Sequence, residues 1–161
     1  ISALAKCPPH IIALLVGDAL FGEHKYLQKL HRQVVELGLE NRVRFLGFRH
    51  NIPQLMTACN LIAHTSIAPE PFRRVIVEAM LCGKTVIASK AGGAIELVEN
   101  GKNGLLVTPG NAEELAYILT DCYHNQESIK VIGNQAKTIA SQNFNIKQTN
   151  QQIHQLICQI L

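Results

Sequence analysis

The chain has 161 residues, of which 47% are hydrophobic and 17% are charged, a composition typical of one globular domain and not of a disordered chain. No apolar run approaches the roughly 20 residues that a membrane span needs, and the first residues lack a charged leader followed by a cleavage site, so we expect a cytoplasmic protein. A net charge of +3 suits an anionic small molecule or a membrane surface without requiring either, and the few aromatic residues, not interleaved with basic ones, argue against a nucleic-acid partner.

The five cysteines are Cys7, Cys59, Cys82, Cys122 and Cys158. They lie far apart, and no pair has the spacing of a zinc site or of a redox motif. Their odd number fits reduced thiols in a cytosol. We therefore predict core or surface cysteines and no metal site.

Short apolar runs alternate with amphipathic stretches along the whole chain. In chain order, the pattern predicts a strand at 11–17, a helix at 23–38, a strand at 43–47, a helix at 52–59, a strand at 60–65, a helix at 72–81, a strand at 85–89, a helix at 94–100, a strand at 103–107, and helices at 112–125, 128–142 and 146–161. Gly38 and Gly83 are expected to end their helices, and Asn111 to cap the helix that follows it.

Strands of about five residues, each followed by a helix, are typical of parallel βα units with right-handed crossovers. Their apolar residues do not alternate, which indicates a sheet covered on both faces. The predicted fold class is α/β, a doubly wound Rossmann-like parallel sheet of about five strands with helices on both faces. No repeat or linker interrupts residues 1–161, so we predict a single domain.

Ligands of such sheets gather at the carboxyl ends of the strands. Glycine recurs at these ends, for example at Gly17, Gly47 and Gly92, and it lets the backbone approach a ligand closely. Two common nucleotide motifs are absent. The Gly83-Lys84-Thr85 triplet lacks the earlier glycine of a phosphate loop and precedes a strand instead of following one. Residues 17–22 do not supply the dinucleotide fingerprint, which argues against a nicotinamide or flavin enzyme.

The stretch 69–93, PEPFRRVIVEAMLCGKTVIASKAGG, places carboxylates on both sides of a helix start. Pro71 suits the first turn of a helix, whose free backbone N–H groups attract anions. Glu78 would lie about 12 Å beyond Glu70 along a regular helix. That distance spans a sugar, a diphosphate and a ribose, and a carboxylate can accept hydrogen bonds from vicinal hydroxyls. The alternative is that Glu70 caps the helix and that Glu78 is a solvated helix residue.

The longer run 70–116, together with LLVGDA, LGLENRVRFLGF and NLIAHTSIAPEPF, resembles the C-terminal domain of retaining glycosyltransferases of family 4, which have the GT-B fold. The resemblance covers nearly the whole chain and implies a nucleotide-diphospho-sugar donor. By this resemblance, Glu70 contacts the hydroxyls of the donor sugar and Glu78 those of the ribose, while the residues 46–49 meet the nucleobase. The full set of expected donor-binding residues is Gly17, Gly47, Phe48, Ser66, Glu70, Phe72, Arg73, Arg74, Glu78, Gly92 and Gly93.

The resemblance also implies the chemistry. Transfer in this family is retaining and needs neither a bound metal nor a cofactor, and the leaving diphosphate accepts the proton of the acceptor. We expect a hexosyltransferase-like enzyme with Glu70 as its catalytic residue, acting by position and charge; Glu70 as a nucleophile is the less favoured alternative. The expected acceptor is a sugar, a lipid or a small molecule, and the intact enzyme could associate peripherally with a membrane.

Two features depart from the family pattern. Arg73 stands where the family usually has glycine, so it could crowd the sugar or alter the preference for a donor. The chain lacks the family's N-terminal domain, the first strand of its C-terminal domain and the Gly-Arg…Lys-Gly loop after that strand. We therefore expect the isolated chain to be inactive. Because the lost strand is central in the order 3-2-1-4-5-6, we predict direct pairing of residues 11–16 with 61–64. The alternative is that two chains exchange elements.

Two other functions stay open at this point. One is a nucleotide-sugar-binding module or subunit without transfer activity, and the other is a sugar epimerase or phosphorylase on the same fold. Outside the quoted motifs, His64 is the one histidine placed to reach a ligand, although a partly buried histidine at a strand end explains it as well. In the last helix, Ile153, Leu156, Ile157 and Ile160 form either a core face or a contact with the missing domain.

Overall fold

The computed structural model describes residues 1–19, 22–68 and 74–160. These residues form two compact units, one made of Ile1–Ile52 and Asn111–Gln126 and the other of Pro53–Gly110 and Glu127–Leu161. We describe each unit by itself. The prediction of a single domain stays a prediction.

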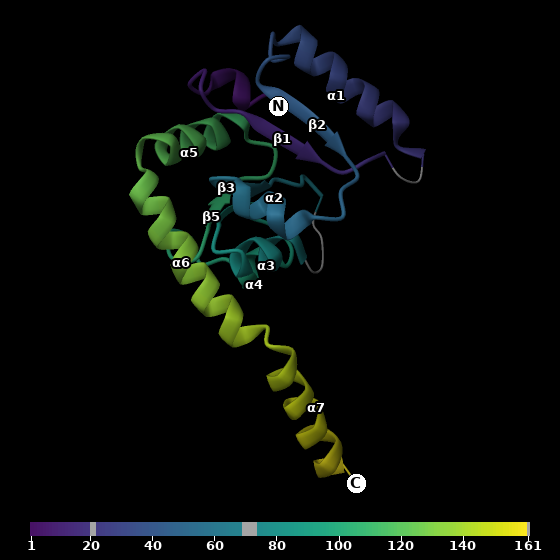
Figure 1. Ribbon diagram of the computed structural model, residues 1–161, viewed down its shortest axis with the longest axis vertical. Coiled ribbons are helices and arrows are strands. Elements are labelled where there is room, and N and C mark those ends of the chain that lie inside the picture. Colours follow the sequence, from purple (N-terminus) through teal and green to yellow (C-terminus); the bar gives the residue numbers. More distant parts are fainter. Residues whose placement is uncertain (20–21, 69–73, 161) are drawn as a thin grey trace. The chain divides into compact units, whose positions relative to one another are not determined.

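The first unit contains two parallel strands, β1 (Ala13–Val16) and β2 (Val43–Gly47). Helix α1 (His24–Glu36) connects them and lies along the pair, as Figure 1 shows. The buried residues Leu4, Val34, Leu39 and Val43 form the core of this unit. They come from the N-terminal 3-10 helix η1 (Leu4–Lys6), from α1, from the turn after it and from β2, and the partly buried Ala13 and Leu15 of β1 pack against them.

Helix α1 ends as its glycine predicts. Gly38 has a φ of +63°, a left-handed conformation that glycine adopts without strain. The Gly38 amide donates to the Val35 carbonyl at 3.0 Å, and the Leu39 amide donates to the Val34 carbonyl at 2.9 Å. These bonds satisfy carbonyls that the last turn would leave free, and they turn the chain toward β2.

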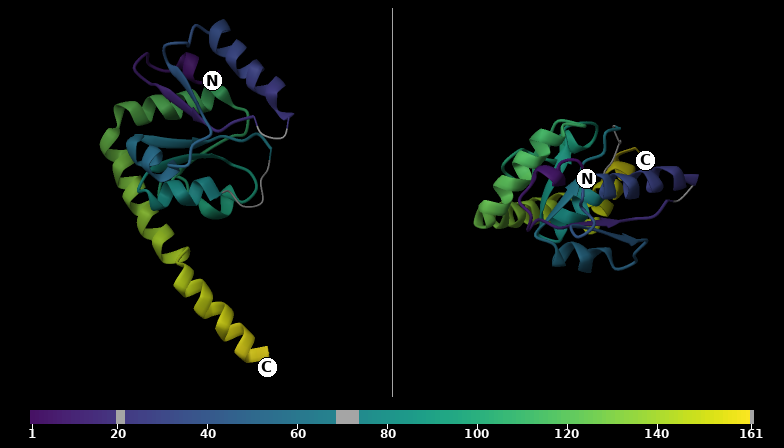
Figure 2. Two further views of the ribbon diagram at one scale, coloured as in Figure 1. Left: turned by 45° about the vertical axis from the view of Figure 1, so that its right-hand side comes forward. Right: turned by 90° about the horizontal axis from the view of Figure 1, so that it is seen from above.

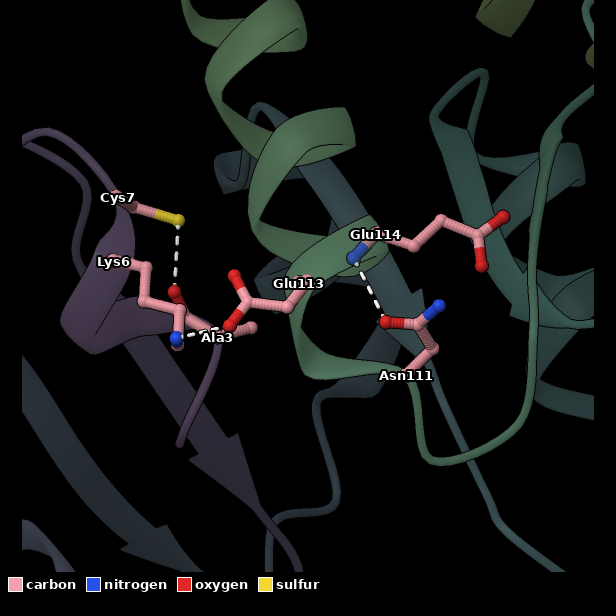
Figure 3. Close-up of polar contacts among 6 residues, drawn as sticks. All are labelled: Ala3, Lys6, Cys7, Asn111, Glu113 and Glu114. Carbon is pink, nitrogen blue, oxygen red and sulfur yellow. Dashed lines mark hydrogen bonds and ion pairs between the residues drawn. The ribbon is translucent and has the colours of Figure 1, made fainter.

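Helix α5 (Ala112–His124) closes the first unit against the N-terminal segment. The Asn111 side-chain oxygen accepts a hydrogen bond from the Glu114 amide at 3.1 Å, which confirms the predicted cap (Figure 3). Glu113 forms an ion pair with Lys6 of η1, and the buried Cys7 thiol donates to the Ala3 carbonyl at 3.2 Å (Figure 3).

The second unit contains a three-stranded parallel sheet with the order β3 (Leu61–His64), β4 (Thr85–Ser89) and β5 (Leu105–Val107). All five residues of the central strand β4 are buried, as expected for a parallel strand covered on both faces. The helices of this unit are α2 (Ile52–Ala58), α3 (Arg74–Leu81), α4 (Ala94–Leu97), α6 (Gln126–Asn143) and α7 (Ile146–Ile160).

Helix α3 packs on β4, and helix α6 packs on the turn between them (Figure 2). Four apolar residues of α3 are buried, namely Ile76, Val77, Ala79 and Met80. Gly83 ends this helix with a φ of +71°, and its amide donates to the Met80 carbonyl at 2.8 Å. Gly133 of α6 lies against this turn so closely that a Cβ there would be 2.5 Å from the Gly83 carbonyl oxygen.

The predicted α/β class is confirmed, since five parallel strands alternate with helices. The predicted pairing of residues 11–16 with 61–64 would join residues of different compact units, and it stays a prediction. Strand β1 pairs with β2, and β3 pairs with β4, in two separate sheets. The two sheets correspond to the 3-2 and the 4-5-6 parts of the doubly wound order, and each strand keeps the neighbour that belongs to its own compact unit. The exchange of elements between two chains stays a prediction.

Candidate functional site

Two predicted glycines lie side by side at the carboxyl ends of β1 and β2. The Gly17 amide donates a hydrogen bond to the Gly47 carbonyl at 3.0 Å. Their φ angles are +137° and +65°, conformations that a residue with a Cβ rarely adopts. The space where either Cβ would project is open to 4 Å. Backbone conformation therefore requires these glycines, and the open space leaves room for a ligand next to the backbone.

Phe48 follows Gly47 and leaves the strand with its ring 55% exposed. The His50 ring contacts it in a T-shaped arrangement, with the ring centroids 4.8 Å apart and an interplanar angle of 86°. Phe48 was predicted as a site residue, whereas His50 was not. The sequence signal for His50 is weak, namely an aromatic residue two positions after the phenylalanine that follows a predicted strand end.

In the second unit, α3 carries the charged pair Arg74 and Glu78 on its outer face. The Arg74 Nε lies 3.6 Å from Glu78 Oε1, and the two side chains are 81% and 41% exposed. The same helix buries the residues on either side of Glu78, so its apolar face fixes the carboxylate on the opposite, accessible face. A carboxylate with one long contact to an exposed arginine keeps lone pairs available for other hydrogen bonds.

The carboxyl ends of β3 and β4 carry the remaining predicted residues of this unit. The Ser66 hydroxyl donates to the Ala68 carbonyl at 3.2 Å. Gly92 has a φ of +53°, and Gly93 is the residue that caps α4. His64 is half-buried at the end of β3, opposite Ala88 in the register. The structure therefore puts Ser66, Gly92 and Gly93 after the ends of neighbouring strands, where ligands of parallel sheets bind.

Three predicted residues, Glu70, Phe72 and Arg73, lie outside the described residues. The predicted start of helix α3 at Phe72 also lies outside the described residues. The first described residue of α3 is Arg74.

Two cysteines are buried and have shifted acidities. Burial raises the pKa of the Cys122 thiol to about 11, and it also raises that of Cys7. Since a thiolate is the reactive form, these two side chains serve packing, as predicted. The described residues include no group of three or more side chains able to hold a metal ion, and none of the described helices is long and apolar enough to cross a membrane.

The family model "Glycosyl transferases group 1" matches residues 1–139. Among curated proteins, the chain is 30% identical over 144 residues to spore coat protein SA of Bacillus subtilis (strain 168), a match that covers 84% of this chain and 37% of that protein. The chain thus spans about a third of the length of the curated relatives that it matches.

The chain is also similar to solved structures. The structure of Anabaena Alr3699/HepE in complex with UDP is 60% identical, with a TM-score of 0.95, and the match covers 98% of this chain and 43% of that one. The UDP-glucose complex of the same protein has a TM-score of 0.93 at equal identity and coverage. The C-terminal domain of LpcC, a glycosyl transferase group 1 family protein of Francisella tularensis, is 25% identical with a TM-score of 0.81, and the match covers 90% of this chain and 77% of that domain.

Proposed function

Because the chain belongs to the group 1 glycosyl transferases, we propose that it is the donor-binding part of an enzyme that transfers a sugar from a UDP-sugar. The observation that carries this proposal is the 60% identity, over 98% of the chain, with a protein whose solved structures hold UDP and UDP-glucose. The matched part of the chain includes the strand ends at which ligands of such sheets bind.

The proposed contacts of the described residues follow their geometry, and those of Glu70, Phe72 and Arg73 follow the family resemblance. Glu78 accepts hydrogen bonds from the ribose hydroxyls, since its carboxylate is accessible on α3. Gly47 and Phe48 contact the nucleobase through the open backbone and the exposed ring. Gly17, Gly92 and Gly93 lie close to the donor, and Ser66 donates to a phosphate oxygen. Glu70 and the backbone of Phe72, Arg73 and Arg74 contact the sugar and the diphosphate.

The proposed reaction is a retaining transfer. The bond between the anomeric carbon and the diphosphate oxygen breaks, the acceptor oxygen bonds to the same face of that carbon, and the acceptor proton passes to the diphosphate. Negative charge grows on the diphosphate as its bond to the sugar breaks. The protein therefore contributes mainly by positioning the donor and stabilising that charge, a role for backbone N–H groups and for Arg74. This mechanism uses no metal and no cofactor.

The acceptor and the setting of the intact enzyme are also proposals. We propose that an N-terminal GT-B domain completes the enzyme and binds a sugar, a lipid or a small-molecule acceptor in the cytoplasm. A lipid acceptor would bring the enzyme to a membrane surface, and this part of it, with a net charge of +3, is not repelled by anionic lipids.

A panel of nucleotides and nucleotide sugars tests the proposal. We expect UDP and UDP-glucose to raise the melting temperature of the purified protein more than the guanosine and adenosine equivalents do. A donor-binding part is supported if UDP-glucose raises the melting temperature of this chain without being turned over, and if the intact enzyme turns it over when an acceptor is added. Conversion of the donor alone by the intact enzyme, without an acceptor, would support the epimerase alternative. The absence of any shift with every nucleotide would refute the proposal.

A further inference from the structure

We propose that His50 is a positioning residue for the nucleobase, because it holds the Phe48 ring in place at the carboxyl end of β2. This inference rests on the proposed function, and it adds to that function a residue and a task. The geometry that points to it is the T-shaped contact between the two rings, with centroids 4.8 Å apart and planes at 86°.

The first step is that Phe48 has little else to hold it. Its ring is 55% exposed, and it follows Gly47, whose positive φ of 65° turns the chain away from the strand. An exposed phenylalanine side chain on a turn can occupy several rotamers. An edge-to-face aromatic contact favours one of them, and His50 supplies that contact from two residues away.

The second step is that a fixed ring suits a planar ligand. A base can stack on an aromatic side chain because every base presents a flat π face. A ring already held in one orientation loses less conformational freedom when the ligand binds, which improves affinity. The space where a Cβ of Gly17 or Gly47 would project is open to 4 Å, and Phe48 directly follows one of these glycines, so we expect a uracil ring to lie against Phe48.

The third step is a control that the molecule itself provides. His31 of α1 stacks on Phe45 of β2, with centroids 3.9 Å apart and planes at 29°. This is a second histidine–phenylalanine pair in the same compact unit, and Phe45 packs against the core and not at a strand end. The variant His31→Ala therefore shows how the loss of a histidine–phenylalanine contact changes the stability of the fold at a place away from the proposed nucleobase site.

The experiment measures by calorimetry the dissociation constants of UDP and of pyrophosphate for the wild-type protein and for three variants, His50→Ala, His50→Phe and His31→Ala. We expect His50→Ala to weaken UDP binding about 2- to 10-fold, the range set by the loss of one aromatic pair, and to leave pyrophosphate binding unchanged. His50→Phe should restore UDP affinity to within about 2-fold of wild type, since it keeps the edge-to-face contact. His31→Ala should lower the melting temperature without changing the affinity for UDP.

Three results would overturn the inference. They are unchanged UDP affinity in His50→Ala, an equal loss of UDP and pyrophosphate affinity in that variant, or no rescue by His50→Phe in a protein that still melts cooperatively. Each of these leaves the proposed function intact as long as the wild-type protein binds UDP. A wild-type protein that binds neither UDP nor another nucleoside diphosphate refutes the proposed function, and the inference about His50 with it.

Discussion

Replacement of Glu78 by alanine should separate binding from stability. On the stability side, Glu78 has one ion pair in the described part of the chain, with Arg74 at 3.6 Å, and both side chains are substantially exposed. Exposed helical pairs of this kind contribute only about 0.3–0.5 kcal/mol, and alanine is the better helix former. We therefore expect the free energy of unfolding to change by less than about 0.5 kcal/mol.

On the binding side, the expected loss is larger. Hydrogen bonds to a charged group contribute about 1.5–3 kcal/mol each, and Glu78 is proposed to accept such bonds from the ribose. Since the carboxylate is also well hydrated in the free protein, we expect a net loss of about 1–3 kcal/mol. This corresponds to a dissociation constant for UDP that is about 5- to 150-fold higher.

Calorimetric titration with UDP measures this loss, and urea unfolding of the same samples measures stability. The matched control is Glu127→Ala, which removes the exposed ion pair between Glu127 and Lys130 of α6, at 2.6 Å, and has no proposed role in binding. The variant Glu78→Gln should retain part of the affinity because it keeps one acceptor oxygen. Unchanged UDP affinity in Glu78→Ala would remove Glu78 from the site and leave it as a solvated helix residue.

Three further predictions concern the fold. Gly133→Ala should lower the free energy of unfolding by about 1–3 kcal/mol in urea titrations, because the new Cβ would meet the Gly83 carbonyl oxygen at 2.5 Å, and this overpacking exceeds the gain in helix propensity of about 1 kcal/mol. Asn111→Ala should destabilise the protein by about 1 kcal/mol through loss of the cap on α5, whereas Asn111→Asp should be close to wild type in the same assay. Cys122, whose pKa is raised to about 11 in the folded protein from 9.0, should make the protein less stable as pH rises from about 9 to 11, because the thiol ionises first in the unfolded chain. The loss should approach about 1.4 kcal/mol per pH unit. It should be smaller in Cys122→Ala, in which the raised pKa of Cys7 still contributes.

Each of these has its own contrary result. A Gly133→Ala protein at least as stable as wild type would mean that α6 shifts freely on the α3–β4 turn. Equal stability of Asn111→Ala and Asn111→Asp would show that the side-chain cap contributes nothing. Parallel pH profiles of wild type and Cys122→Ala would place the Cys122 thiol in contact with water.

Much of the fold could be predicted because its signals are local. Helix α1 ends at the predicted glycine, Asn111 caps α5, and the predicted strand β4 is buried throughout. The pairing of strands could not be predicted in the same way, because it depends on contacts between distant residues. Strand β1 pairs with β2, as the order 3-2-1-4-5-6 implies, whereas no local feature of residues 11–16 selects residues 61–64 as a second neighbour.

In the candidate site too, the residues with local sequence signals could be predicted, whereas those that depend on the folded conformation could not. Gly17, Gly47 and Phe48 are predictable because a glycine after an apolar run signals a strand end. The contact of His50 with Phe48 depends on the turn that the positive φ of Gly47 creates, a conformation that the sequence permits without requiring it. The role of Arg73 in place of the usual glycine stays a prediction, since it lies outside the described residues.

The measurement that tests the central claim most directly is a titration of the isotope-labelled protein with UDP, followed by the chemical shifts of its backbone amides. The account predicts saturable changes that concentrate at Gly17, at Gly47 to His50, around Glu78 and at Gly92 and Gly93. Saturable changes confined to other parts of the chain, or none at millimolar UDP, would contradict it.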